Sequence, residues 1–300
     1  MHGDHIGHLF ALLAAINWAF ALVLFKRSGE HVSPLSLNIF KNTVGIVLLV
    51  ATLAATGQGW QVLRSYPVED VAILVLSGVL GIALADTIQF IALNAVGVGT
   101  ISVIDCTYSP IAVMLGWLML GEKLSVGDWS GIVLIVAGVL LAADRRAAGT
   151  QSTRQTALGV LAGVGAIALM VVSIVFAKPV LTVDRFPLVW ATLLRLSVGT
   201  VVLAVMAVAS PDRRQVWSCF RPTRVWWYSV SGSVLGAYLA MLFWVGGFKY
   251  ARVSEAAILN QTSVIFAIIL ATVVLKEPFG RRRLLAVCSA LSGAALVTLA

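Results

Sequence analysis

Four ionisable side chains interrupt stretches of this chain that are otherwise almost entirely apolar. Lys41 and Arg195 supply positive charge, and Asp86 and Asp105 supply negative charge. A charged side chain costs about 2.5–3.5 kcal/mol at the centre of a membrane-spanning helix, so it usually faces other protein groups or a water-filled cavity. Two positive and two negative side chains suit a zwitterionic solute such as an amino acid, because its ammonium and its carboxylate each need a partner of opposite charge. Alternatively, the four groups pair with one another and only hold helices together.

Amide and aromatic side chains accompany these charges at helical spacing. Gln89 lies three residues after Asp86, and Tyr108 lies three residues after Asp105, so each pair shares one helix face. Aromatic rings inside apolar stretches can contact an ammonium through the ring face, although many such rings only pack. Amides can instead form hydrogen bonds between helices. The predicted substrate-binding residues are Trp18, Lys41, Asp86, Gln89, Asp105, Tyr108, Tyr238, Trp244 and Asn260.

Other residues in these stretches are predicted to bend or close the protein. Pro110 removes a backbone hydrogen bond and can kink a helix, so we expect a hinge there. Glu122 and Glu277 each end an apolar stretch, where we expect a carboxylate to neutralise a helix dipole or gate access rather than contact substrate. Arg195 occupies a position matched to that of Lys41, which favours a structural or gating role for it as well.

Ten stretches have the length and apolar character of membrane-spanning helices, each of which needs about 20 mainly apolar residues. We therefore predict an all-α integral membrane protein with ten transmembrane helices. A polar linker, residues 147–156, separates a first five-helix repeat, residues 1–146, from a second, residues 157–300. The predicted spans are 8–26, 35–56, 69–92, 98–120, 127–143, 157–177, 187–209, 225–247, 254–275 and 283–299.

The second half repeats features of the first at a constant distance. Glu122 and Glu277, each at the end of an apolar stretch, are 155 residues apart. Single matches between other residue types can arise by chance in sequence rich in Leu, Ala and Gly, but two glutamates that each end an apolar stretch are not such a chance match. Because each copy has an odd number of spans, the second copy enters the membrane from the opposite side, which predicts inverted repeats. Pairs 154 or 155 residues apart are Lys41 with Arg195, Gly78 with Gly232, Asp105 with Asn260, Glu122 with Glu277, and Gly138 with Gly293.

Composition narrows the class of protein and of partner. Hydrophobic residues make up 60% of the chain and charged residues only 11%, whereas soluble domains carry about 25% charged residues. The net charge of +8 is spread over short segments between apolar stretches, a placement that favours lipid headgroups over nucleic acid. The three cysteines show no metal-type spacing, and there is no phosphate-binding loop for direct ATP drive. We expect no metal and no cofactor.

With these motifs in place, the whole chain resembles the EamA-type ten-helix members of the drug/metabolite transporter superfamily. The resemblance is carried by Asn17-Trp18 in the first helix, Arg195 in the second helix of the second half, Pro110 and Gly121-Glu122 in the fourth, and Gly131 with Gly138 in the fifth. The halves have diverged, because Lys41, Ser263, Lys276 and Leu169-Met170 stand where the pattern has other residues. Relatives of this type include amino-acid exporters similar to YddG.

The resemblance and the charges together predict a secondary transporter in the bacterial inner (plasma) membrane, with many spans and no enzymatic activity. It would export small metabolites, most readily amino acids, by alternating access around a central cavity between the two repeats. Export of another metabolite or a drug, an intramembrane enzyme, and a passive channel or receptor are the alternatives. The sequence does not distinguish proton-coupled transport from facilitated diffusion. It also does not give the oligomeric state, and a monomer is compatible with it. Loop charges place both termini outside, whereas the resemblance implies cytoplasmic termini.

Overall fold

The computed structural model describes residues 2–59, 66–111, 114–115, 125–142, 153–182, 187–223, 225–250 and 253–299. Helices and their connections make up all of the structure in these ranges, without a β-strand. Six of the helical segments are long and apolar enough to cross a membrane, and two shorter apolar helices, Trp129–Ala142 and Leu259–Val273, accompany them in the described part of the chain. The all-α membrane character predicted from the sequence is therefore confirmed.

The helices occupy the regions where apolar spans were predicted. In the first half they are α1 (His2–Gly29), α2 (Pro34–Thr56), α4 (Val68–Ser77), η1 (Gly78–Ala85), α5 (Asp86–Val96), α6 (Val98–Asp105) and α8 (Val126–Ala142). In the second half they are α9 (Thr153–Thr182), α10 (Leu188–Ala209), α11 (Arg213–Trp217), η2 (Ser218–Phe220), α12 (Trp226–Ser233), η3 (Val234–Ala240), α13 (Met241–Tyr250), α14 (Val253–Val273) and α15 (Arg281–Leu299).

Local sequence explains where several helices begin and end. The Oγ of Ser33 accepts a hydrogen bond from the backbone N–H of Ser36 at 3.2 Å, and Pro34 at the first helical position has no N–H to leave unsatisfied. Gly57 ends α2 in the left-handed conformation at φ 68°. Gly97, at φ 81°, forms the one-residue turn between α5 and α6 and so lets the chain reverse within the bundle.

The predicted third and eighth spans differ from uniform α-helices. A π-helix, η1, lies between α4 and α5, and a second π-helix, η3, lies between α12 and α13. Each π turn holds one more residue than an α turn, and such segments occur often at functional sites. The two π-helices begin 156 residues apart, close to the spacing of the sequence repeat. Residue types alone did not indicate them, because every residue in both segments also fits an α-helix.

The predicted fourth span is interrupted inside its first half. Helix α6 ends at Asp105, a turn follows at Cys106 and Thr107, and helical structure resumes at Tyr108. Pro110 has no N–H with which to reach the carbonyl of Cys106, so the interruption lies where this proline would break the helical hydrogen bonding. A distortion next to Pro110 is therefore present, and its use as a hinge stays a prediction.

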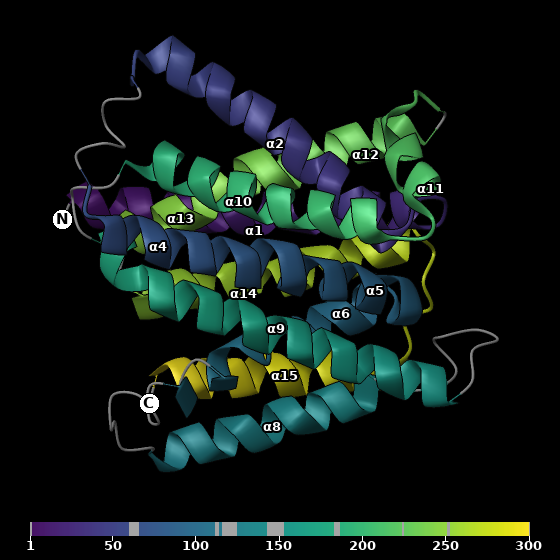
Figure 1. Ribbon diagram of the computed structural model, residues 1–300. Helices are drawn as coiled ribbons and strands as arrows, with labels where there is room; N and C mark the ends of the chain where they lie inside the picture. Colours follow the sequence, from purple (N-terminus) through teal and green to yellow (C-terminus); the bar gives the residue numbers. More distant parts are fainter. Residues whose placement is uncertain are drawn as a thin grey trace.

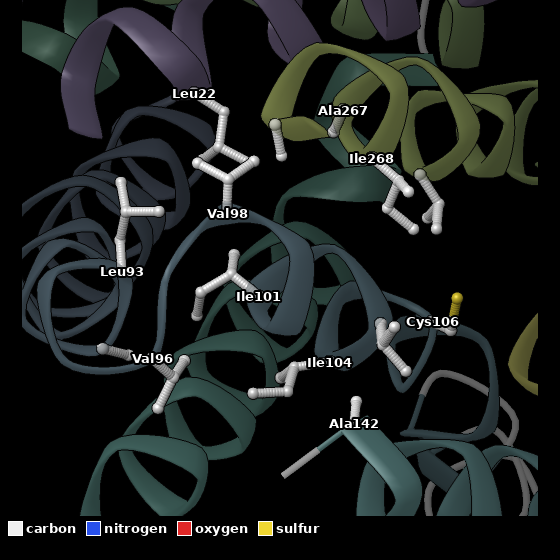
Figure 2. Packing of buried hydrophobic residues seen from close by; sticks show 14 of the residues in the cluster. Leu22, Leu93, Val96, Val98, Ile101, Ile104, Cys106, Ala142, Ala267 and Ile268 are labelled. Atoms are coloured by element: carbon white, nitrogen blue, oxygen red, sulfur yellow. The ribbon is translucent and has the colours of Figure 1, made fainter. Parts of the chain in front are cut away.

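The helices lie side by side in one bundle, with α8 and α15 paired along its lower edge in Figure 1. Helix α1 packs against α12, α13 and α14, and α9 packs against α4, η1, α5 and α6. Figure 2 shows a buried apolar cluster in which Leu22 of α1, Val98 of α6 and Ile268 of α14 converge. Helices from both halves therefore share one core.

Glycines let neighbouring backbones approach closely, which is how helices associate in lipid. An added Cβ at Gly138 would lie 2.7 Å from the carbonyl oxygen of Ala286, and one at Gly293 would lie 2.6 Å from that of Gly131. Gly293 is the repeat counterpart of Gly138, and Gly131 is the counterpart of Ala286, each at a distance of 155 residues. The two contacts between α8 and α15 are therefore equivalent in the two halves. At Gly78, an added Cβ would lie 2.6 Å from the carbonyl oxygen of Arg195.

We predict that Gly78→Ala destabilises the fold by about 1–3 kcal/mol, because the new methyl group meets the α10 backbone, which cannot rotate away. The matched control is Gly165→Ala in α9, where an added Cβ has no neighbour within 4 Å and alanine favours the helix by about 1 kcal/mol. Apparent melting temperatures in detergent measure both. Equal melting temperatures for the two variants would contradict the close approach.

Candidate functional site

A cavity of about 160 Å³ lies in the middle of the bundle. Its wall is built by α1, α2, η1, α5 and α6 of the first half and by α9, α10, η3, α13 and α14 of the second. Most of the wall is apolar, and its few polar groups include the ionisable side chains singled out by the sequence. Such a cavity suits a small solute.

Lys41 and Asp86 form a buried ion pair in the cavity wall. The Nζ of Lys41 donates to the Oδ2 of Asp86 at 2.6 Å and to the Oδ1 of Asn42 at 2.7 Å, and only 2% of Lys41 and 6% of Asp86 are exposed. Helix α2 supplies the lysine, and the first turn of α5, directly after η1, supplies the aspartate. The two charges therefore neutralise each other across two helices.

Asp105 and the amides form a second polar group in the wall. The Nε2 of Gln89 donates to the Oδ1 of Asp105 at 3.0 Å, which connects α5 with the end of α6. Across the two halves, the Nε2 of Gln261 donates to the Oγ of Ser109 at 3.1 Å. The Oε1 of Gln89 and the Nδ2 of Asn260 are buried and have no hydrogen-bond partner. Both residues line the cavity, and these two amide atoms have unused hydrogen-bonding capacity.

Arg195 differs from Lys41 although the two residues are matched in the repeat. Its guanidinium is 3% exposed, lines the cavity and donates from Nη2 to the Oγ of Ser173 at a long 3.4 Å. Its Nε and Nη1 have no partner. No carboxylate oxygen of the described residues lies within 4.0 Å of it. A buried guanidinium with unused donors is therefore part of the cavity wall.

The structure brings together most of the residues predicted to bind substrate. Tyr238 does not line the cavity: its hydroxyl lies 2.7 Å from that of Thr52, and its ring packs in an apolar cluster between η3 and α2. Arg195, Gly81, Met170 and Gln261 line the cavity but were not among the predicted substrate-binding residues. The predicted residues in the wall are Trp18, Lys41, Asp86, Gln89, Asp105, Tyr108, Trp244 and Asn260.

Glu277 connects helices at one end of the bundle. Its carboxylate accepts hydrogen bonds from the backbone N–H groups of Val98 at 2.9 Å and Gly99 at 3.1 Å, at the N-terminus of α6. The Nη2 of Arg283, at the start of α15, donates to the same carboxylate at 2.7 Å. A carboxylate at a helix N-terminus satisfies free N–H groups and favours the helix dipole. The predicted partner in the repeat, Glu122, lies outside the described residues.

The C-terminal turn of α1 is fixed at the same end. The Nζ of Lys26 donates to the backbone carbonyls of Leu93 and Asn94 at 3.2 and 3.0 Å, at the end of α5. Arg27 donates to the carbonyl of Val274, just after α14, at 3.3 Å. Cationic side chains thus satisfy carbonyl groups that helix ends leave free. Together with Glu277, they connect α1, α5, α6, α14 and α15.

A second hollow lies beside η2, where the ends of α2 and α12 meet the connecting segments. It has a volume of about 230 Å³, and its lining includes Ser36, Ser218, Cys219 and Trp226. Burial raises the pKa of the Cys219 thiol to about 11, so this group stays an unreactive thiol at neutral pH. No group of three or more His, Cys, Asp or Glu side chains placed to hold a metal ion occurs in the part of the chain that the structure describes. The central cavity is therefore the stronger candidate site.

We predict that replacing one partner of the Lys41–Asp86 pair lowers the stability of the protein more than replacing both partners. Asp86→Asn and Lys41→Met should each lower the stability by about 3–5 kcal/mol, because each leaves one buried charge unpaired. The double variant Lys41→Met/Asp86→Asn should melt above either single variant. The exposed pair Arg27–Glu30, at 3.8 Å, is the control, and Glu30→Gln should change the stability by less than about 1 kcal/mol. Additive losses in a double-mutant cycle would show that the two side chains are not coupled.

Loss of the Glu277 carboxylate should destabilise the end of the bundle that it connects. Glu277→Gln keeps the size but leaves the buried Arg283 without a counter-charge, so we expect a loss of about 1.5–3 kcal/mol in detergent melting experiments. Glu69→Gln, in the exposed first turn of α4, is the matched control and should melt like the unaltered protein. A Glu277→Gln melting temperature within error of this control would refute the assigned role.

Comparisons with known proteins agree with this architecture. A crystal structure superposes with a TM-score of 0.71 over 99% of this chain and 97% of that chain at 18% identity, which shows the fold. The uncharacterized transporter YvbV of Bacillus subtilis is 25% identical over 89% of this chain and 84% of its own length. A riboflavin transporter of Brucella anthropi is 28% identical over 48% of this chain and 50% of its own length. The EamA-like transporter family matches residues 5–143 and 157–299, so this chain is a membrane transporter that belongs to the EamA-like family of the drug/metabolite transporter superfamily.

Proposed function

We propose that the protein is a secondary transporter of the bacterial inner membrane that exports small metabolites, with amino acids as its first candidate substrates. Ten helices in two inverted five-helix repeats, residues 1–146 and 157–300, would move against each other around the central cavity. Alternating access of this kind exposes one site to each side of the membrane in turn. The single observation that carries the proposal is the central cavity between helices of both halves, which is lined by two basic and two acidic side chains.

The inverted-repeat architecture is supported by three independent observations. The family matches each half of the chain separately. Both halves contain a π-helix in the corresponding span and at the cavity wall. The contacts of Gly138 with Ala286 and of Gly293 with Gly131 are related by exchange of the two halves, as expected for an approximate two-fold axis.

The charges in the wall favour a zwitterionic solute. The ion pair of Lys41 and Asp86 adds no net charge, which leaves the cation of Arg195 and the carboxylate of Asp105. An amino acid offers one group for each, and the cavity of about 160 Å³ has room for a small metabolite. Riboflavin, the solute in the name of one relative, lacks a charged pair of this kind and is larger, so it is the second candidate.

Counterflow in proteoliposomes tests the proposal. Vesicles loaded with unlabelled amino acids should accumulate external radiolabelled amino acid faster than protein-free vesicles, and the flux should saturate, which a channel would not show.

Trp18→Ala and Asp105→Asn should reduce counterflow at least tenfold while folded yield falls less, because both residues line the cavity. Equal losses of flux and folded yield would identify these residues as structural. Riboflavin counterflow without amino-acid counterflow would favour the second candidate, and a response to an imposed pH gradient would indicate proton coupling.

A further inference from the structure

We infer that Arg195 is the carboxylate-binding residue of the substrate site, so that transported solutes must carry a free carboxylate. The inference rests on the proposed function, because it concerns the same cavity, and it goes further by assigning one side chain to one chemical group of the solute. It also gives Arg195 a role other than the structural or gating role that its sequence position favoured.

The first argument is the contrast between the two cations of the wall. The Nζ of Lys41 is held by Asp86 and Asn42 at 2.6 and 2.7 Å, so it has two acceptors of its own. Arg195 has one long hydrogen bond to Ser173 and two nitrogens without a partner. A guanidinium keeps its charge at neutral pH and offers five N–H donors. Of the two, only Arg195 has side-chain donors without a hydrogen-bond acceptor.

The second argument is that the surroundings of Arg195 keep space for its guanidinium. Gly81 of η1 lies against it: an added Cβ there would lie 3.4 Å from Nη2 of Arg195 and would collide with the Oγ of Ser173. Gly78, one turn earlier, gives the same π-helix room to approach the α10 backbone. Because neither glycine has a side chain, η1 can lie close to α10 and to Ser173. The guanidinium then stays at the cavity, and the space that a ligand needs is not filled.

The third argument is the chemistry of the missing partner. The planar fork of a guanidinium matches the two oxygens of a carboxylate, which accepts two parallel hydrogen bonds. An ionised group buried without a partner is strongly unfavourable, so a ligand that supplies the counter-charge gains much of its binding energy there. Asp105, which accepts one hydrogen bond from Gln89, is left to bind an ammonium or another donor of the same solute.

The test compares amino acids with analogues that lack either the free carboxylate or the amino group. Purified protein in detergent is titrated with alanine, valine, leucine, isoleucine, methionine and phenylalanine, with the α-carboxamides of these amino acids, and with their deamino carboxylic acids. Thermal stabilisation gives the apparent affinity. We expect the acids to bind at least about 30-fold more tightly than the amides, the equivalent of about 2 kcal/mol for one unpaired buried charge.

Variants assign this preference to Arg195. Arg195→Gln should bind acids as weakly as amides, and Arg195→Lys should keep only part of the preference because a lysine cannot form the bidentate contact. Ser173→Ala removes the protein partner of Arg195 and should leave the preference for acids unchanged, whereas a purely structural arginine would make it resemble Arg195→Gln. Arg214→Gln, an exposed arginine in α11, is the control for loss of a positive charge.

The outcomes separate this inference from the proposed function. Amides that bind as well as acids to the unaltered protein would overturn the inference, even if amino acids show counterflow and even if Arg195→Gln does not fold. Binding of the deamino carboxylic acids that depends on Arg195, without amino-acid counterflow, would support the inference while the amino-acid proposal fails. If neither acids nor deamino acids stabilise the protein, the assignment of Arg195 is wrong.

Discussion

The structure depends on one constraint, which is that buried polar groups inside a membrane protein must find their partners within the protein. Backbone groups meet it by forming helices, and side chains meet it in pairs such as Lys41 with Asp86. Buried polar atoms that remain without a partner then become informative. Three of the residues that carry them, Gln89, Arg195 and Asn260, line the same cavity. The unmet hydrogen-bonding capacity of the bundle is thus concentrated where a solute would bind.

Close backbone contact and local widening of helices occur together around this cavity. At Gly78 and Gly199, η1 and α10 approach so closely that a methyl group at either position would meet the neighbouring helix. The π turns of η1 begin at this contact, and they bring Gly81 and Ile82 to the cavity wall before α5 continues with Asp86. The helix therefore packs tightly at one end of the π segment and presents the ion pair at the other.

The sequence predicted the helical membrane fold because apolar length and charge spacing depend on local composition. It also predicted the ionisable residues of the cavity wall, because an ionisable group in an apolar helix has few favourable positions. It could not predict which charges pair: Lys41 and Arg195 occupy matched positions, but of these two described residues only Lys41 forms an ion pair with a carboxylate within 4.0 Å. The side-chain direction of Tyr238 depends on the π turns of η3, which residue types do not reveal.

The polar contacts of Lys26, Arg27 and Glu277 define what a transport cycle would have to change. They join α1 to α5 and α14, and α14 to α6, all at one end of the bundle. Each contact uses a backbone group at a helix end, so it can break without disturbing a hydrogen bond inside a helix. A movement of the two halves that opens the cavity toward this end has to separate the contacts of Arg27 with Val274 and of Glu277 with α6, which join one half to the other. The same movement can leave the pair of Lys41 and Asp86 intact, since both of its helices belong to the first half.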